Sequence, residues 1–196
     1  PARLERSASL LGRGAQAIRC DVRDDLQVEA LFRSVEKLFG GLDVLVNNAG
    51  VGLFATVGEM TPEQWRTVIE TNLSGPFYCS RLAIPLMKRR GGGYIVNISS
   101  LAGKNAFAGG AAYNASKFGL TGFSEALMLD VRYDNIRVSC LMPGSVETEF
   151  AGSTGAPTGW KLSPTDVAES VLDMLRLPPR ALASRVEMRP LRPPRK

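Results

Sequence analysis

The residues with the clearest chemical potential are Tyr113 and Lys117, which stand four positions apart in the run YNASK. On a helix this spacing puts both side chains on one face. A free phenol has a pKa of about 10, so lowering it to near 7 requires about 4 kcal/mol. An ammonium about 4 Å away supplies a similar energy in a partly buried cleft, but far less on an open helix surface. The pair therefore predicts a tyrosine that exchanges protons near neutral pH, provided that it is partly buried.

Two polar residues earlier in the chain could complete this arrangement. Ser100 stands thirteen residues before Tyr113, just after the apolar run at 94–98, and could donate to a substrate oxygen as charge develops there. The same hydroxyl could instead cap a turn. Asn72 falls on an apolar helix stripe, where its amide must find hydrogen-bond partners. It is therefore either a functional amide or a purely structural one.

The elements that must position these residues alternate between strand and helix. Strands are expected at 15–22, 42–46, 94–98, 136–142 and 183–188. Helices are expected after an Asp24 cap up to residue 39, at 62–90 with a bend near Gly75 and Pro76, at 111–133 and at 164–177. This alternation predicts one α/β domain over 1–196, with a doubly wound, Rossmann-like parallel sheet in a three-layer α/β/α arrangement.

Ligands of such a sheet bind outside the carboxyl ends of its strands. Three polar or glycine-containing segments are expected at that edge, each directly after a predicted strand: 47–50, 99–100 and 143–144. Loops at this edge carry binding and catalytic residues in sheets of this type. The sequence therefore predicts that the chemistry of the domain takes place there.

The composition excludes several classes of site. The chain has no histidine, which removes His-ligated metals and Ser-His-Asp catalysis. Its cysteines Cys20, Cys79 and Cys140 form no CxxC pair, so we expect no metal site and a reducing, cytoplasmic location. No apolar run reaches the roughly 18–20 residues of a membrane span. Residues 176–196 hold seven basic residues against one acidic, so the body of the chain is not expected to bind nucleic acid.

In combination, the polar residues resemble the Asn-Ser-Tyr-Lys tetrad of the short-chain dehydrogenase/reductase family. The matching positions are Asn72, Ser100, Tyr113 and Lys117, supported by Asp21, NNAG at 47–50, IVNISS at 95–100 and PGSVET at 143–148. The order and spacing fit the family from about residue 15 to the end. The resemblance implies an oxidoreductase that moves a hydride between NAD(P) and a carbonyl or secondary-alcohol substrate of small size.

The resemblance also implies a role for each residue. Tyr113 is the general acid in carbonyl reduction and the general base in alcohol oxidation. Lys117 lowers its pKa and hydrogen-bonds the nicotinamide ribose, Ser100 holds the substrate oxygen, and Asn72 supports a water relay to Lys117. The residues implied in cofactor binding are Asp21 and Val22 at the adenine, Asn47, Ala49 and Gly50 on the adenosine side, Pro143, Gly144, Val146 and Thr148 at the nicotinamide, and Tyr113 and Lys117.

One part of the family pattern is not found in this sequence. The family carries a glycine-rich turn, TGxxxGxG, that cradles the pyrophosphate at a helix N-terminus. We therefore expect an N-terminally truncated domain without strands 1 and 2 and the first helix of the family. The strand at 15–22 would then have no partner, and the 42–46 strand would have an open edge. Weak cofactor binding is expected, which isothermal titration with NADH and NADPH would measure.

Substrate, cofactor preference and assembly stay open at this stage. The general basicity of the chain gives a slight lean to NADP over NAD. The loops at 101–112 and 145–162 are rich in small residues and predict a modest, mostly apolar pocket, with the second loop as a mobile lid. Family members commonly dimerise through the two long helices, so a homodimer or homotetramer is implied. The alternative function is a non-catalytic relative that serves as the partner of a full-length subunit.

Overall fold

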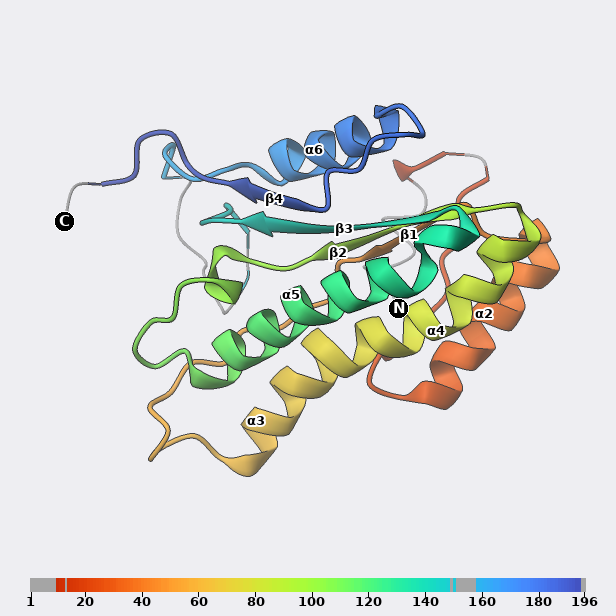
Figure 1. Ribbon diagram of the computed structural model, residues 1–196. Coiled ribbons are helices and arrows are strands. Elements are labelled where there is room, and N and C mark those ends of the chain that lie inside the picture. The colour runs from red at the N-terminus through yellow and green to blue at the C-terminus, as the bar shows by residue number, and fades with distance from the viewer. Residues whose placement is uncertain (1–9, 13, 149, 151–157, 195–196) are drawn as a thin grey trace.

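Four parallel strands form the centre of the computed structural model, which describes residues 10–12, 14–148, 150 and 158–194. The strands are β1 (Val44–Asn47), β2 (Gly93–Ile98), β3 (Ile136–Pro143) and β4 (Arg185–Met188), in the spatial order β1-β2-β3-β4. Every pairing is parallel, with Asn47 opposite Asn97 and Asn97 opposite Cys140. All four strands therefore end at the same edge of the sheet (Figure 1).

Helices cover both faces of this sheet. On one side lie α2 (Asp25–Phe39), α3 (Pro62–Ile69), α4 (Gly75–Arg89) and α5 (Ala111–Val131), and on the other lies α6 (Pro164–Arg176) (Figure 1). Parallel strands between two helical layers are the arrangement expected from alternating strands and helices. The predicted α/β, Rossmann-like fold class is confirmed.

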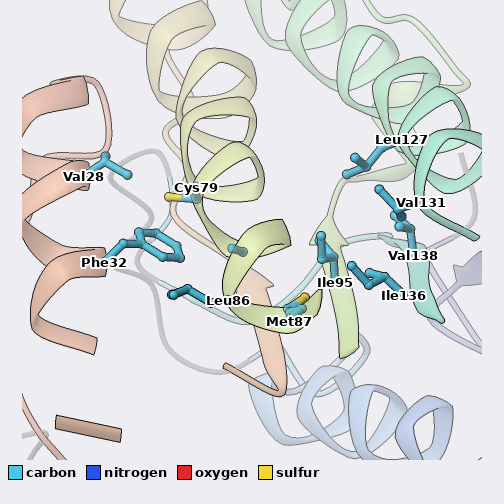
Figure 2. Packing of buried hydrophobic residues seen from close by; sticks show 11 residues of the cluster. Val28, Phe32, Cys79, Leu86, Met87, Ile95, Leu127, Val131, Ile136 and Val138 are labelled. Atoms are coloured by element: carbon cyan, nitrogen blue, oxygen red, sulfur yellow. The ribbon is translucent and has the colours of Figure 1, made fainter. Parts of the chain in front are cut away.

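The side chains of β2 alternate between these two layers. Ile95 packs in a buried cluster with Met87 of α4 and Leu127 of α5 (Figure 2). Tyr94 points to the opposite face and packs in a second cluster with Met174 of α6. A strand that is buried on both faces is apolar over most of its length, which explains the apolar residues at 94–98. The one polar residue among them, Asn97, is hydrogen-bonded to Asn47 and Ser124.

The helix starts that the sequence predicted are present. Asp24 caps α2 by accepting hydrogen bonds from two backbone N–H groups of its first turn. Thr61 and Gln64 form a reciprocal capping box at the start of α3, and Ser163 and Asp166 form another at the start of α6. These local bonds satisfy N–H groups that a helix cannot pair internally. They place α3 and α6 where the sequence alone predicted them.

The predicted strand at 15–22 is wrong, because that segment has no regular secondary structure and pairs with no strand among the described residues. A strand needs a neighbour to satisfy its backbone N–H and C=O groups. The neighbouring edge of β1 is open as well, with Val44 and Val46 37% and 42% exposed. Without strands 1 and 2 of the family, the 15–22 segment is expected to be unpaired and the edge of β1 to be open. The described residues show both.

The expected bend of the 62–90 helix is a π-helical turn at Glu70–Ser74, between α3 and α4. The N–H of Gly75 donates to the carbonyl of Glu70, five residues back. Pro76 has no N–H to offer the carbonyl of Asn72, and its ring would crowd that carbonyl in a regular α-helix. The wider turn relieves this crowding, and it places Asn72 in the irregular segment.

Part of the predicted lid cannot be followed in the structure. Residues 149 and 151–157 lie outside the described residues. The described ends of this segment meet, since the N–H of Glu147 donates to the carbonyl of Leu162 over 2.8 Å. Within the described ranges, none of the helices has the length and hydropathy to cross a bilayer.

Candidate active site

Tyr113 and Lys117 lie on the first two turns of α5, directly below the carboxyl end of β2. Both side chains are buried, with 9% of Tyr113 and 5% of Lys117 exposed. The Lys117 ammonium donates to the carbonyl of Ile98 over 2.9 Å, and its Nζ lies 5.8 Å from the centre of the Tyr113 ring. The structure thus brings the two residues together in the buried setting that their chemistry requires.

Burial governs the electrostatics of this pair. It raises the pKa of Tyr113 above 10.0, and interaction with the Ser100 hydroxyl lowers this pKa only in part. Burial also lowers the pKa of Lys117 from 10.5 to about 8. The predicted lowering of the Tyr113 pKa by Lys117, with any further cation helping, stays a prediction for the cofactor-bound site, and in the structure burial raises this pKa. The reason is that the ammonium is held by the Ile98 carbonyl while the ring lies in a poorly solvated site.

Ser100 stands at the end of β2 and performs the turn role that the sequence left open. Its Oγ accepts a hydrogen bond from the N–H of Ala102 over 3.1 Å and caps the short 3-10 turn Leu101–Gly103. A serine hydroxyl that accepts one bond still has its own proton to donate. The same Oγ interacts with Tyr113. Ser100 is therefore placed both to hold the turn and to donate to an oxygen beside the phenol.

Asn72 is fully buried and its amide joins three segments of the chain. Its Oδ1 accepts from the N–H of Val51 over 2.8 Å, and its Nδ2 donates to the carbonyl of Val51 over 2.9 Å. The same Nδ2 donates to the Oγ of Ser116 on α5 over 3.1 Å. The side chain therefore fastens the loop after β1 to the helix that carries Tyr113. The predicted water relay stays a prediction.

An open cleft of about 630 Å³ lies beside the same sheet edge. Its lining residues come from the irregular 19–22 segment, the start of α2 and the loop after β1: Arg19, Cys20, Asp21, Val22, Gln27 and Ala49. Three of these, Asp21, Val22 and Ala49, are residues for which the sequence predicted contact with the adenosine part of a cofactor. The structure brings them together although the 15–22 segment is not a strand.

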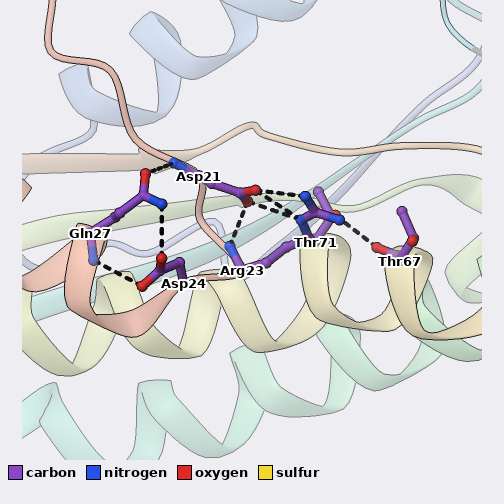
Figure 3. Close-up of polar contacts among 6 residues, drawn as sticks. All are labelled: Asp21, Arg23, Asp24, Gln27, Thr67 and Thr71. Carbon is purple, nitrogen blue, oxygen red and sulfur yellow. Dashed lines mark hydrogen bonds and ion pairs between the residues drawn. The ribbon is translucent and has the colours of Figure 1, made fainter. Parts of the chain in front are cut away.

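The carboxylate of Asp21 is turned toward Arg23, as Figure 3 shows. The Arg23 guanidinium donates to both carboxylate oxygens over 2.6–3.1 Å. These hydrogen bonds lower the pKa of Asp21 to about 2. The backbone N–H of Asp21 donates to the amide of Gln27, which Asp24 also binds (Figure 3). This local network holds the cleft wall with no help from a neighbouring strand.

Asn47 differs from the other adenosine-side residues in the direction of its side chain. The side chain is buried, and its Nδ2 donates to Asn97 over 2.8 Å and to Ser80 over 3.3 Å. It therefore links β1 to β2 and α4.

By contrast, Gly50 leaves space open: a Cβ there would lie 3.4 Å from Oδ1 of Asn72 and 3.8 Å from Nζ of Lys117.

The residues expected at the nicotinamide follow β3 and lie next to Ser100. Pro143 ends β3, and the N–H of Gly144 donates to the carbonyl of Met188 over 2.8 Å. A Cβ on Gly144 would lie 3.1 Å from the side chain of Leu101, the neighbour of Ser100. Further on, Val146 forms a bridge with Leu162, and Thr148 is exposed and accepts from the N–H of Phe150. This segment therefore runs along the carboxyl edge beside the Tyr113 site.

A family model for short chain dehydrogenases matches residues 2–158. The chain belongs to the short-chain dehydrogenase family. A Streptomyces coelicolor relative named "Putative ketoacyl reductase" is 43% identical over 136 residues, covering 68% of this chain and 52% of the relative. A Mediterraneibacter gnavus relative named 3alpha-hydroxysteroid dehydrogenase is 32% identical over 161 residues, covering 77% of this chain and 64% of the relative.

Among solved structures, this short-chain dehydrogenase chain is similar to an alcohol dehydrogenase from Thermococcus sibiricus complexed with 5-hydroxy-NADP. The TM-score is 0.89 at 28% identity, over 100% of this chain and 85% of that one. In sequence, the chain spans about half the length of the Streptomyces relative. The fold and the family are thus shared with both proteins, whose named substrates differ.

Three phenylalanines near Tyr113 were not singled out in the sequence of this family member. The ring centroid of Phe54 lies 5.6 Å from that of Tyr113 and 5.7 Å from that of Phe107. The ring of Phe150 lies 5.6 Å from Tyr113 on another side. They come from three different loops, so no spacing connects them in the sequence. Their one shared signal is that each follows a strand at the carboxyl edge.

The turn after Ser100 depends on a glycine for its close contact with α5. A Cβ on Gly103 would lie 2.6 Å from the backbone oxygen of Lys117, which cannot move without distorting the helix. We expect Gly103→Ala to lower the free energy of unfolding by about 1–3 kcal/mol. Gly122→Ala is the matched control: nothing lies within 4 Å of its added Cβ, so about 0.5–1 kcal/mol of stabilisation is expected in the helix interior. Urea denaturation followed by circular dichroism measures both, and equal effects would contradict the close contact.

Proposed function

We propose that this chain binds a nicotinamide cofactor and interconverts a carbonyl and a secondary alcohol, with Tyr113 as the proton donor and acceptor. The observation that carries the proposal is the burial of Tyr113 and Lys117 beside the half-buried Ser100 at the carboxyl edge of a short-chain dehydrogenase sheet. A buried phenol and a buried ammonium in one place are costly to maintain, and such groups gather at functional sites. The proposal gives a role to the Tyr113 phenol, the Lys117 ammonium and the Ser100 hydroxyl.

The residues present fit such a cofactor at both ends. The cleft of about 630 Å³ beside Asp21, Val22 and Ala49 offers room for the adenosine part. At the other end, the absent side chain of Gly50 leaves the approach to Lys117 open, which a Cβ would partly fill. Arg19 lines the same cleft and would attract an additional phosphate, so we propose NADP ahead of NAD. The NADP derivative bound to the Thermococcus relative supports this choice.

In this proposal each residue has a separate task. The nicotinamide supplies or accepts the hydride. Ser100 donates a hydrogen bond to the substrate oxygen, and Tyr113 gives that oxygen its proton as the bond order of the carbonyl falls. Lys117 holds its ammonium between the Ile98 carbonyl and the space that Gly50 leaves free. Because burial raises the pKa of Tyr113, the phenol stays protonated at neutral pH, which favours reduction there and oxidation at higher pH.

We also propose that a second copy of the chain covers the outer sides of α4 and α5. Three large apolar residues on these helices, Phe77, Phe118 and Leu129, are 45–57% exposed. Apolar side chains at that exposure along two adjacent helices are typical of a surface that pairs with another surface. This would give a homodimer, or a homotetramer with one further interface, and a cytoplasmic enzyme of this kind would act on a small molecule alone.

The decisive experiment is a panel of ketones and aldehydes with millimolar NADPH or NADH, followed by the loss of cofactor absorbance. We expect turnover with NADPH above the rate without protein, and a preference for NADPH over NADH. Titration calorimetry of the same chain with each cofactor measures binding, which we expect to be weaker than micromolar. A chain that forms a stable dimer but reduces no carbonyl at saturating cofactor would support the non-catalytic partner function instead.

A further inference from the structure

The phenylalanines around Tyr113 form one aromatic cluster, which we define as Phe54, Phe107, Phe150 and the Tyr113 ring. Phe54 stands edge-to-face against Phe107, at 67°, and against Tyr113, at 84°. Phe150 lies at 56° to Tyr113. The phenylalanines come from the loops after β1, β2 and β3. Phe54 and Phe150 contact the ring of the proposed proton donor, and Phe107 contacts Phe54.

Two of these loops are held together by their backbones. The N–H of Ala55 donates to the carbonyl of Gly109 over 2.9 Å, and Ala55 forms a bridge with Gly110. Phe54 and Phe107 therefore stand on segments that are bonded to each other. A pair of rings on bonded loops keeps its spacing with little loss of entropy when a ligand binds.

The loop of Phe107 is also fastened to the residue that follows Tyr113. Asn114 is buried; its Nδ2 donates to the carbonyls of Ala102 over 2.7 Å and of Asn105 over 3.2 Å. Its Oδ1 accepts from the N–H of Phe107 over 3.3 Å. The position of the Phe107 ring is thereby tied to the start of α5, and so to the Tyr113 hydroxyl.

Phe150 closes the cluster by lying over a glycine. A Cβ added to Gly52 would be 2.6 Å from the ring of Phe150 and 3.0 Å from the ring of Phe54. The absence of a side chain at this position lets both rings approach each other. Gly52 thus determines the width of the space between two members of the cluster.

The rings are buried on one side only. Phe54 is 48% exposed, Phe107 46% and Phe150 39%, while the Tyr113 ring beneath them is buried. Single exposed apolar residues need no explanation, but a set gathered around one reactive hydroxyl is typical of a ligand site. Aromatic rings in edge-to-face contact prefer another ring to a saturated group of the same shape, because their edges and faces carry opposite partial charge.

We propose that the aromatic cluster selects carbonyl substrates with a flat aromatic ring fused or attached close to the carbonyl, and discriminates against saturated or polar substrates of the same size. The proposal rests on the proposed function, since it places the carbonyl at Tyr113. It adds the chemical class of the group that the substrate carries beside the carbonyl. Phe54 and Phe107 would bind the ring, and Gly52 with Phe150 would limit its thickness.

The test compares 2-tetralone, a ketone with a fused aromatic ring, with its saturated counterpart 2-decalone. We expect kcat/KM to be about tenfold higher for 2-tetralone than for 2-decalone. Phe54→Leu or Phe107→Leu should lower this ratio by about three- to tenfold. Gly52→Ala should act on the preference as well, since its Cβ displaces the Phe150 ring. Phe39→Leu is the control, because Phe39 is exposed at the end of α2, outside the cluster. Equal kcat/KM values for the two ketones, or a preference that the variants leave unchanged, would overturn the proposal.

A binding measurement separates this proposal from the proposed function. Saturation-transfer NMR with 2-naphthol and with decahydro-2-naphthol needs no cofactor and no turnover. We expect a signal for 2-naphthol that falls in Phe54→Leu and Phe107→Leu and persists in Phe39→Leu. If neither ketone is reduced but 2-naphthol binds in this way, the proposed function fails and the cluster proposal stands. Absence of 2-naphthol binding, with or without ketone reduction, would overturn the cluster proposal.

Discussion

Replacing Tyr113 by phenylalanine is expected to lower kcat/KM for carbonyl reduction by about 10²–10⁴-fold, the range that general acid catalysis contributes. The change removes one oxygen and retains the ring, which packs against Phe54 and Phe150. The hydroxyl is the only group in the cluster that can give a proton to a carbonyl oxygen. We therefore expect the loss to fall on kcat, while the urea midpoint stays close to that of the wild type.

The pH dependence provides a second readout for this variant. Burial raises the pKa of Tyr113, so its phenolate form, which is the base in alcohol oxidation, becomes populated only at alkaline pH. We expect the oxidation rate of the wild type to rise with pH up to the alkaline limit of stability. The residual rate of Tyr113→Phe should lack this rise. Cofactor absorbance followed over a pH series measures both.

The matched control for Tyr113→Phe is Tyr133→Phe, because Tyr133 is 93% exposed and lies in the 3-10 turn Arg132–Asp134, which follows the far end of α5. This control should leave turnover unchanged. If Tyr113→Phe keeps wild-type kcat and the wild-type pH profile, another group donates the proton and the assignment of Tyr113 is wrong. The two variants remove the same atom from a buried and an exposed ring, so a difference between them isolates the site.

Most of the fold could be predicted because its signals are local. The Thr61 capping box and the apolar runs of β2 and β3 each specify an element within a few residues. Their alternation then requires a parallel sheet, and the parallel sheet brings 47–50, 99–100 and 143–144 to one edge. The site was therefore predictable in outline, as a place on the sheet and as a set of polar residues.

What failed or was missed depends on non-local contacts. The segment 15–22 has the composition of a strand, but a strand forms only by pairing with another, and no described strand pairs with this segment. The role of Asn72 as a clamp is set by Val51 and Ser116, which lie 21 and 44 residues away. The effect of burial on Tyr113 likewise depends on how three loops fold over it. No pattern within one stretch of sequence contains this information.

A second large effect is expected at Lys117, where stability and activity should change in opposite directions. An ammonium whose pKa falls from 10.5 to about 8 costs about 3 kcal/mol of folding free energy at neutral pH. Lys117→Met removes this cost and keeps much of the side-chain volume. It also leaves the Ile98 carbonyl without its donor, which costs about 1 kcal/mol. We therefore expect the variant to be about 2 kcal/mol more stable than the wild type by urea denaturation at neutral pH, and to lose most of its turnover.

The gain in stability of Lys117→Met over the wild type should decrease as the pH rises. Below about pH 8 the lysine is protonated in both the folded and unfolded chain, so the cost is present in full. Between about 8 and 10.5 the folded chain has lost this proton while the unfolded chain keeps it, so the stability of the wild type rises with pH. The difference between Lys117→Met and wild type should therefore shrink over this window. Both proteins share the raised thiol pKa values of Cys20 and Cys79, whose contributions cancel in the comparison.

Lys88→Met serves as the control for this series. Lys88 is half exposed and pairs with Asp134 on the surface, so its removal should change stability by less than about 1 kcal/mol. A Lys117→Met variant that is less stable than wild type at neutral pH would mean that the buried ammonium contributes to the fold. A stable but inactive variant would instead mean that the chain tolerates a costly buried charge because catalysis requires it. The sign of one unfolding measurement thus decides between a structural and a catalytic reason for placing a lysine inside α5.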